Sequence, residues 1–465
     1  MTTAQTLVNF IDLFDIMGPV MIGPSSSHTA GAAKIGYFAF QLLGDSPKKI
    51  RIKLFNSFSD TGKGHKTDLA LLGGCIGISP DDERLLFSIE QAKAQKLEFK
   101  IKWGYHSSDL HPNTAIIELE SANFQVGVVG YSIGGGRIQI IKQYRRPIGG
   151  LSNSKKSSSL DETIFQNNHN KSKSTAHEKY FTFQELSDKA KSGKQLMELI
   201  VTIQAQSHQQ TSEKILEELE RRWLIMVGSV AKGVSNYRRS QNKMFGGDAY
   251  RIRRSKLNIL NDEIENSIYY SIGVAEHNAR MGKIVAAPTA GSAGIMPGVL
   301  RSLQEKFYFS DKQMAKALLI AGGIGAVIAN KTELAGAVGG CQAEIGAAGA
   351  MTAAAGTYLL KGNSEAIEAA ASLVLANLLG LTCDPVMGLV EVPCILRNGM
   401  VASMVMAAIE IALDGVRYPI PFDEVVDVMK KVGDDMHSAY KETSTGGLAQ
   451  TTTARSMCRG CQKCD

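Results

Sequence analysis

A polar stretch at residues 151–175 constrains the fold of this chain more than any other feature. Ser, Asn and Lys supply 15 of its 25 residues, and it has little apolar content and no hydrophobic periodicity. Such a segment cannot bury enough apolar surface to fold alone, so it predicts a flexible linker. The chain has 465 residues, about three times a typical domain of roughly 150 residues. We therefore expect a domain at 1–145, a linker at 146–182, a second domain at 183–457 and a Cys-rich tail at 458–465.

The part before the linker has a mixed α and β pattern. Strand-like apolar runs are found at 50–55, 114–119, 124–129 and 137–141, separated by turn-rich segments. Residues 30–43 instead have helical spacing. This pattern predicts an α+β N-terminal domain.

The part after the linker is helical from about Phe183 onward. Residues 196–220 have the apolar spacing of helices, and 315–412 predict a succession of helices. In 321–356, 21 of 36 residues are Gly or Ala, and such small side chains let helix backbones approach closely. The predicted fold class is an α+β N-terminal domain joined by a flexible linker to a mainly α-helical C-terminal catalytic domain.

The net charge argues against a nucleic-acid groove, and the length of the uncharged stretches argues against a membrane span. The net charge is +6, from 51 basic and 45 acidic residues, which is mild for a chain of this length. No basic segment followed by an apolar core opens the sequence, so we expect no secretory signal. The uncharged stretches 317–330, 345–360 and 369–383 run 14 to 16 residues, short of the roughly 20 that a spanning helix needs. A cytoplasmic location is expected.

Three of the seven cysteines lie at boundaries marked by Gly or Pro, where side chains from different helices can converge. They are Cys341 in GGCQ, Cys383 in TCDP and Cys394 in PCI. Each alone is consistent with a small buried apolar residue. Together, in a chain without an export signal, they favour a metal site over disulfides, and thiolates select iron–sulfur clusters, zinc or copper(I). Their spacing does not choose among these.

The last residues contain a second cysteine pattern, Cys458-x-x-Cys461-x-x-Cys464. The pattern is compatible with a zinc or redox site. It is equally compatible with a chain end whose thiols have no role. A third interpretation is that one of these cysteines completes the distant three-cysteine site.

The segment 23–31, GPSSSHTAG, predicts the capped start of a helix. Backbone N–H groups and the helix dipole make such a start a site for a carboxylate. Plain capping explains the serines too, but His28 just inside the turn favours a functional site. The loop PTAGSAG at 288–294 precedes another predicted helix, at 295–303, and is a second potential anion site.

The loop 60–68, DTGKGHKTD, places a histidine and two lysines on a glycine-flexed turn. The spacing of a phosphate-binding P-loop is absent, so we interpret His65 as a general base, with Lys63 near it. A solvated charged turn is the alternative. His106, His111 and Asn113 follow in the same domain without a carboxylate pattern, which favours structural roles over metal binding.

These motifs occur together, and in order, in a known family. The segments are GPSSSHTAGA, TGKGHKTD, HPNTA, SIGGGR, GGDA, APTAGSAGIMPGVL, GGCQAEIG, CDPVMGLVEVPC and KETSTGGLA. They resemble the iron–sulfur L-serine dehydratases over nearly the whole chain outside the linker. That family occurs as separate small and large chains or as one fused chain, and this sequence resembles a fusion with the small-chain part first. The PTAGSAG loop is more similar to the two-chain form, and no ACT-type regulatory module is found at the linker.

The resemblance implies a [4Fe–4S] cluster held by Cys341, Cys383 and Cys394. It also implies that a cysteine at the C-terminus caps the fourth iron until substrate displaces it. The penultimate Cys464 matches that cysteine, with Cys458 and Cys461 as alternatives.

The implied reaction is the dehydration of L-serine, giving pyruvate and ammonia without pyridoxal phosphate. The implied setting is amino-acid degradation and gluconeogenesis, in a homodimer. We expect His65 and Lys63 to act in catalysis. The expected substrate-binding residues are Ser25, Ser26, Ser27, His28, Thr29, Asn113, Thr289, Gly291 and Ser292.

Two other classes of protein remain as alternatives at this point. An electron-transfer or redox-sensing iron–sulfur protein would need four fixed thiolates. A binding module with zinc in its tail would use the CRGCQKC segment instead.

Overall fold

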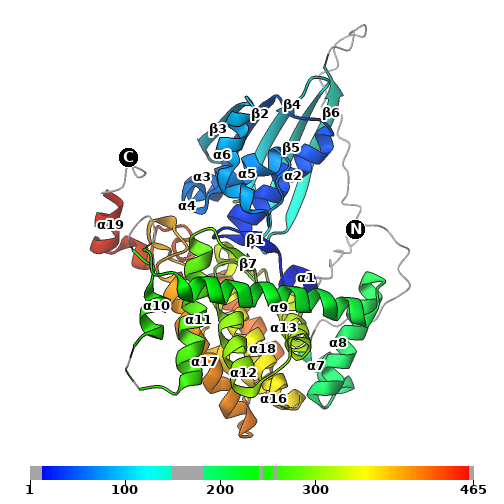
Figure 1. Ribbon diagram of the computed structural model, residues 1–465, viewed down its shortest axis with the longest axis vertical. Helices are drawn as coiled ribbons and strands as arrows, with labels where there is room; N and C mark the ends of the chain where they lie inside the picture. Colours follow the sequence, from blue (N-terminus) through cyan, green and yellow to red (C-terminus); the bar gives the residue numbers. More distant parts are fainter. Residues whose placement is uncertain (1–12, 149–181, 240–243, 256, 258, 460–465) are drawn as a thin grey trace.

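The computed structural model describes residues 13–148, 182–239, 244–255, 257 and 259–459. It consists of a small α+β domain above a larger helical domain in Figure 1. The predicted fold class is confirmed in both halves. The predicted linker lies almost entirely outside the described residues, as do Cys461 and Cys464.

The small domain is built on one five-stranded sheet with strand order β3-β2-β4-β5-β6. Strands β2 and β3 are parallel, and the other neighbouring pairs are antiparallel. Helices α2, α5 and α6 lie on one face of the sheet (Figure 1). The strands are β2 (Lys49–Phe55), β3 (Glu98–Tyr105), β4 (Thr114–Glu120), β5 (Phe124–Ser132) and β6 (Ile138–Pro147).

The helices and turns of the small domain connect these strands. They are η1 (Ser26–Gly31), α2 (Ala32–Leu43), α3 (Ser57–Asp60), α4 (Gly62–His65), α5 (Thr67–Cys75), η2 (Glu83–Phe87) and α6 (Ser88–Ala94). The π-helical turn η1 is capped by Ser25 and continues directly into α2, so the capped start predicted at 23–31 leads into the helix predicted at 30–43.

Four of the five strands coincide with predicted apolar runs, and β3 was missed. Strand β3 is at the edge of the sheet, and none of its residues is fully buried. Its lysines alternate with partly buried residues such as Ile101 and Trp103. A charged edge strand of this kind protects a sheet from pairing with other chains, and its weak apolar content hides it in the sequence.

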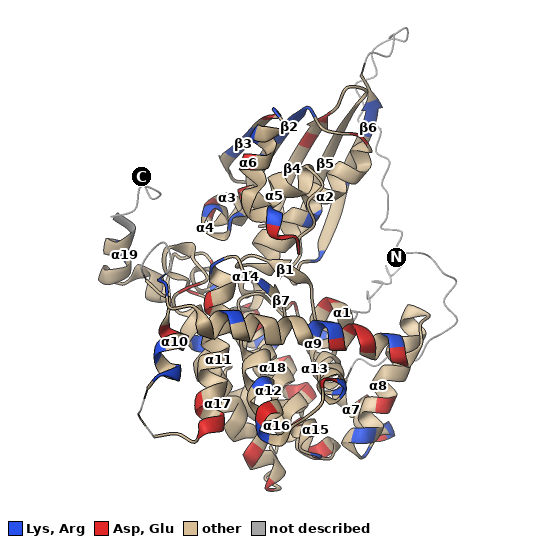
Figure 2. Ribbon diagram, viewed as in Figure 1, with Lys and Arg blue, Asp and Glu red and all other residues tan. Residues whose placement is uncertain are grey.

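The helical domain packs around two central apolar helices, α13 and α15. Every residue of α15 except Tyr358 is buried, and most of α13 is buried too. A methyl group at Gly356 would lie 2.3 Å from Cδ1 of Ile409, so only glycine permits this approach of α15 to α17. Charged residues of both signs lie along the outer helices α8 and α9 (Figure 2).

The helices of this domain, in chain order, are α7 (Phe183–Lys189), α8 (Gly193–His208), α9 (Ser212–Ser235), α10 (Asp248–Arg253), α11 (Asp262–Ala279), α12 (Ile295–Phe307), α13 (Asp311–Lys331), α14 (Gly336–Gly339), α15 (Ala347–Leu359), α16 (Ser364–Asn377), α17 (Cys394–Leu413), α18 (Phe422–Asp435) and α19 (Thr452–Arg459). Short turns are η3 (Gln342–Gly346), η4 (Val386–Gly388), η5 (Ser438–Tyr440) and η6 (Gly447–Gln450). The apolar spacing at 196–220 belongs to two helices, because Gln209 adopts a positive φ of 52° and Thr211 caps α9.

Two of these helices, α13 and α17, are long and apolar enough to cross a membrane by length and composition alone. The apolar window of α13 is 83% buried inside the protein, and that of α17 is 50% buried. The burial of α13 is typical of a core helix, and two such helices are weak evidence for membrane spans.

The first described residues join the two domains. Helix α1 (Leu13–Ile16) belongs to the core of the helical domain, where Leu13, Ile16 and Met17 are buried. Strand β1 (Val20–Ile22) then pairs antiparallel with β7 (Lys283–Val285) of the helical domain. The chain therefore crosses the domain boundary before it builds the small domain.

Candidate functional site

The three internal cysteines, far apart in sequence, line one pocket between the two domains. Cys341, Cys383 and Cys394 are all buried there. The remaining lining residues are Pro24, Ser25, Ser26, Gly291, Glu344, Ile345, Pro385, Val390 and Glu442. The pocket thus combines thiols and carboxyls of the helical domain with the helix start of the small domain.

Each cysteine is positioned by a different local structural feature. Cys341 follows Gly340, whose φ of +73° turns the chain after α14. Cys383 is held by backbone hydrogen bonds: its amide donates to the Tyr440 carbonyl at 2.8 Å, and its carbonyl accepts from the Glu442 amide at 2.8 Å. Cys394 is the first residue of α17.

Asn398 connects the Cys394 helix to the glycine-rich loop at 288–294. Its side-chain amide donates to the carbonyls of Gly291 at 2.9 Å and Cys394 at 2.8 Å. Its Oδ1 accepts from the amide of Gly294 at 3.0 Å. Within the loop, the hydroxyls of Thr289 and Ser292 lie 3.1 Å apart, and both residues are buried. Of the three loop residues predicted to bind substrate, only Gly291 lines the pocket.

The acidic groups of the pocket perturb one another. The Sγ atoms of Cys341 and Cys383 and a carboxylate oxygen of Glu344 lie within 4.8 Å of one another. A hydrogen bond with Cys341, together with burial, raises the pKa of Cys383 well above its usual value. Burial and the neighbouring Cys341 do the same to the pKa of Cys394.

Two carboxyl groups share this environment. Burial raises the pKa of Glu344 to about 7, opposed by hydrogen bonds from the Thr289 side chain and the Gly336 backbone. Burial and the charge of Glu344 raise the pKa of Glu442 to about 8, opposed by a hydrogen bond from the Ala337 backbone. Carboxyls and thiols so close together cannot all ionise without a cation to compensate them.

The donor set therefore suits a thiophilic metal centre. Three buried cysteines that converge from separate elements offer soft thiolate ligands, as iron–sulfur clusters and zinc require. The cavity left between the side chains measures about 20 Å³, so a cluster is accommodated only if the side chains around it move apart. Cys75 in the small-domain core and the three pocket cysteines are free thiols.

The predicted helix start at 23–31 divides into a pocket-facing and a supporting half. Ser25 and Ser26 line the pocket, and Ser25 Oγ accepts from the His28 amide at 3.1 Å. Ser27, His28 and Thr29 do not line it. The His28 ring instead contacts the hydroxyls of Ser27 at 2.9 Å, Ser57 at 3.0 Å and Thr61 at 3.1 Å.

His65 lies directly behind this helix start, at the end of α4. Its ring centroid is 4.6 Å from that of His28, and its carbonyl accepts from the Thr29 hydroxyl at 2.8 Å. The side chain is fully buried, and neither ring nitrogen has a hydrogen-bond partner among the described residues. Burial lowers the pKa of His65 to about 4, opposed by the nearby Thr61 backbone, so the ring is neutral at neutral pH.

The remaining predicted site residues lie further from the thiols. Lys63 is exposed on the same turn as His65. Asn113 is buried in the small domain, where its side chain donates to the Ser132 carbonyl at 3.2 Å. His111 stacks on Tyr131, and its Nδ1 accepts from the Asn113 amide, so it has a structural environment.

Four polar residues in or beside the pocket were not predicted from the sequence: Glu344, Glu442, Asp384 and Arg397. The Arg397 guanidinium donates to the Thr382 carbonyl at 2.7 Å and to Asp384 at 3.1 Å. Asp384 also accepts from the Leu448 amide at 2.8 Å, which ties the C-terminal segment to the cysteine loop. Glu344 could have been predicted from a local pattern, because it is an acidic residue three positions after Cys341 in a segment of small residues.

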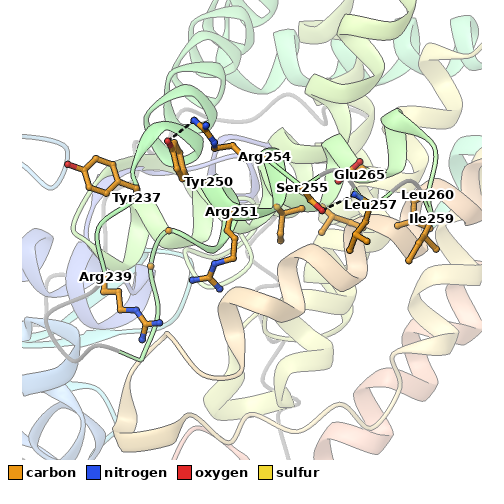
Figure 3. Close-up of a pocket in the computed structure, with 14 residues that line it drawn as sticks. Tyr237, Arg239, Tyr250, Arg251, Arg254, Ser255, Leu257, Ile259, Leu260 and Glu265 are labelled. Carbon is orange, nitrogen blue, oxygen red and sulfur yellow. Dashed lines mark hydrogen bonds between the residues drawn. The ribbon is translucent and has the colours of Figure 1, made fainter.

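A larger cavity, of about 810 Å³, lies elsewhere, beside α10 and α11 (Figure 3). Its arginines are exposed and engaged: Arg251 pairs with Asp248, and Arg254 donates to the Tyr250 hydroxyl. No thiol and no unpaired buried group lines its described part. The neighbouring glycine motif at 246–249 directs the amides of Gly247 and Asp248 to the protein's own Glu276. This cavity offers no chemistry comparable to the cysteine pocket.

Comparison with known proteins places both halves in one group. Residues 9–143 match the family model described as serine dehydratase beta chain, and residues 191–449 match that of serine dehydratase alpha chain. The chain is 31% identical to an L-serine dehydratase of Haemophilus influenzae, with 94% of this chain and 98% of that protein covered. It is 31% identical to L-serine dehydratase 2 of Escherichia coli, with 96% and 99% covered.

A protein of Bacillus subtilis named as a probable L-serine dehydratase alpha chain matches the helical half alone. It is 40% identical over 265 residues, which cover 56% of this chain and 88% of that protein. The single chain thus contains, in the order beta then alpha, what other organisms encode as two.

Proposed function

Because the chain belongs to the L-serine dehydratase family, as a fusion of its beta and alpha parts, we propose that it converts L-serine to pyruvate and ammonia with an iron–sulfur cluster. One observation carries this proposal. Three thiols of the alpha part meet the helix start of the beta part in one pocket. A substrate carboxylate and a metal centre would be held side by side there.

Cys341, Cys383 and Cys394 are the residues that would hold a [4Fe–4S] cluster. When bound, the cluster supplies a Lewis acid that stabilises the departing hydroxide, a poor leaving group without such help. The capping thiol of the fourth iron is proposed to be Cys464, with Cys458 and Cys461 as alternatives. Helix α19 ends at Arg459, directly before Cys461 and Cys464, which lie outside the described residues.

The substrate carboxylate is proposed to bind at Ser25 and Ser26. Turn η1 continues into α2, so the helix dipole of both elements points its positive end at the pocket. First-turn amides and the two serine hydroxyls are suitable donors for a carboxylate. Ser27, His28 and Thr29 would support this turn, while Thr289 and Ser292 would shape the loop that carries Gly291.

His65 is proposed to remove the α-proton. Its low pKa keeps it neutral, and a base needs that free lone pair. The ring lies behind His28, so a small movement of the turn at 60–68 is required to bring it to substrate. Lys63, exposed on the same turn, is proposed to assist. Elimination of water leaves aminoacrylate, which tautomerises and is hydrolysed to pyruvate and ammonia.

The wider setting follows from the same proposal. We propose a cytoplasmic homodimer that degrades serine and supplies pyruvate for gluconeogenesis. The free thiols of Cys75, Cys341, Cys383 and Cys394 suit the reducing conditions of a cytoplasm. An electron-transfer centre is less well supported, because the helix start at Ser25 and Ser26, which we propose to bind a carboxylate, lies beside the thiols.

Anaerobic purification followed by measurement of pyruvate release from L-serine, without pyridoxal phosphate, tests the proposal. Rapid release that stops on exposure to air, with loss of iron, is the expected result. Protein that holds four irons and releases no pyruvate would contradict the assigned reaction. Zinc in place of iron would instead favour the alternative in which the cysteines bind a structural metal.

A further inference from the structure

The pocket contains two carboxyl groups that the proposed mechanism leaves without a role. Glu344 belongs to η3 of the helical core, and Glu442 lies on the segment that pairs with Cys383 near the C-terminus. Both line the same pocket, and both side chains are largely shielded from solvent. Two separate parts of the chain thus each contribute a carboxyl group.

Both groups are oriented by backbone amides at the start of α14. Gly336 donates to Glu344, and Ala337 donates to Glu442. A methyl group at Gly336 would lie 2.8 Å from Oε2 of Glu344 and 2.9 Å from Sγ of Cys383. Only glycine at position 336 therefore permits this carboxyl to lie against the thiols.

Among the described residues, no basic side chain is paired with these two carboxyls. Its described lining contains no Lys, Arg or His. The Arg397 guanidinium, beside the pocket, donates to Thr382 and Asp384 and also interacts with the thiols of Cys341 and Cys394. A cation that arrives with the ligand would favour the ionised form of both carboxyls.

L-Serine carries such a cation. In the proposed function its carboxylate binds at Ser25 and Ser26 and its hydroxyl faces the thiols. The α-ammonium group remains, and the two carboxyls are the anionic groups of the pocket wall. We propose that Glu344 and Glu442 bind the substrate ammonium and make this pocket select α-amino acids over α-hydroxy acids of the same size. This inference rests on the proposed function of the pocket.

The competing role for either carboxyl is removal of the α-proton. An ammonium-binding carboxyl acts on binding, so its loss raises KM and removes the preference for an amino group. A general base acts on the chemical step, so its loss lowers kcat and leaves the preference intact. The two roles thus give opposite results in one experiment.

The test uses anaerobically prepared holoenzyme and two ligands that cannot lose a β-hydroxyl, L-alanine and L-lactate. Calorimetry of the wild type should show L-alanine binding at least about 30-fold more tightly than L-lactate, the effect expected for loss of a partner from a buried charge pair. In the Glu442→Gln variant this preference should fall below threefold. The KM for L-serine should rise about 30-fold or more, with kcat within threefold of the wild type.

Two further variants keep the result interpretable. Glu368→Gln removes a partly buried carboxyl that accepts from the Phe422 amide outside the pocket, and it should retain the preference. Glu442→Asp keeps the charge on a shorter side chain and should retain the preference with weaker affinity. Iron content and thermal unfolding are measured for each; should Glu442→Gln lose iron, Glu344→Gln takes its place.

Several outcomes would overturn the inference. They are equal binding of L-alanine and L-lactate by the wild type, an unchanged preference in Glu442→Gln, and a large fall in kcat at unchanged KM. Failure of the proposed function looks different. A wild type that prefers L-alanine yet releases no pyruvate from L-serine would retain the ammonium site and lose the assigned reaction.

Discussion

Asn398 offers a sharp test of how the pocket is assembled. Its side chain is fully buried and joins the Cys394 helix to the loop at 288–294 through Gly291 and Gly294. Replacing Asn398 with Leu keeps approximately the same volume but removes the donor and the acceptor. The Gly294 amide would then be buried without a partner, and the partly exposed Gly291 carbonyl would lose its donor.

The magnitude follows from these two groups. An orphaned buried amide costs about 1–3 kcal/mol, and the loss of a partly exposed hydrogen bond costs about 0.5–1.5 kcal/mol. The Asn398→Leu variant should therefore lose about 2–4 kcal/mol of unfolding free energy. For a helical domain of this size the loss corresponds to a fall in Tm of roughly 3–7 °C.

The same substitution should weaken substrate binding, because Gly291 lines the pocket. Loss of the equivalent of one hydrogen bond to substrate raises KM for L-serine about tenfold. Calorimetric melting and steady-state pyruvate release measure the two effects. Asn377→Leu, which removes an exposed amide that bonds only within α16, is the matched control and should change neither.

An unchanged Tm in Asn398→Leu would refute the reasoning about buried partners. A lower Tm with unchanged KM would show that the loop at 288–294 has a structural role only. The two readouts thus separate the stability of the loop from its part in binding.

Three other perturbations give distinct expectations. Each of the variants Cys341→Ala, Cys383→Ala and Cys394→Ala should lose iron binding and activity together. An active, iron-free variant would contradict the cluster assignment. Cys464→Ser should yield a cluster that decays faster in air, and unchanged decay would move the capping role to another tail cysteine or to none. Burial, reinforced by Lys232 and Arg280, lowers the pKa of His277 to about 4, so this histidine stays neutral in the folded protein while the unfolded chain takes up a proton below about pH 6.5. The stability that the neutral His277 provides is complete above pH 6.5 and is lost as the pH falls toward 4, by about 2 kcal/mol at pH 5. Between pH 7.5 and 5, denaturant titrations should therefore show an unfolding free energy that falls by about 2 kcal/mol less in His277→Gln than in the wild type. An identical pH dependence of the two proteins would refute the assignment.

Local patterns in the sequence were enough to predict the two-part fold and part of the site. Apolar alternation predicted β2, β4, β5 and β6, because β2, β4 and β5 bury residues on the sheet's covered face and β6 packs the partly buried Ile138 and Ile140 against the same core. The capped start at Ser25 is encoded by adjacent residues, so it too was predictable. The cysteines were recognised as a group from their Gly and Pro neighbours, and the structure brings them together.

The features that escaped prediction depend on contacts between distant segments. Glu442 enters the pocket only because the Tyr440 carbonyl and the Glu442 amide bond to Cys383, some sixty residues earlier in the chain. No spacing rule connects those two positions. Similarly, the pairing of β1 with β7 joins residues more than 250 positions apart, so the early segment was not expected in the helical domain.

That early segment explains why the pocket requires both parts of the chain. Leu13 and Ile16 are buried in the core of the helical domain, and β1 is fixed to β7 immediately afterwards. Ser25 follows the end of β1 by three residues, so the position of the substrate-facing helix start is set by the helical domain rather than by the small-domain sheet. The small domain then supports the same helix from the other side, through the hydrogen bonds of His28 and Thr29 to residues 57–65. A shift of either domain would move Ser25 relative to the thiols. The alignment of the proposed carboxylate site with the proposed metal site therefore depends on two sets of contacts, the pairing of β1 with β7 and the hydrogen bonds of His28 and Thr29.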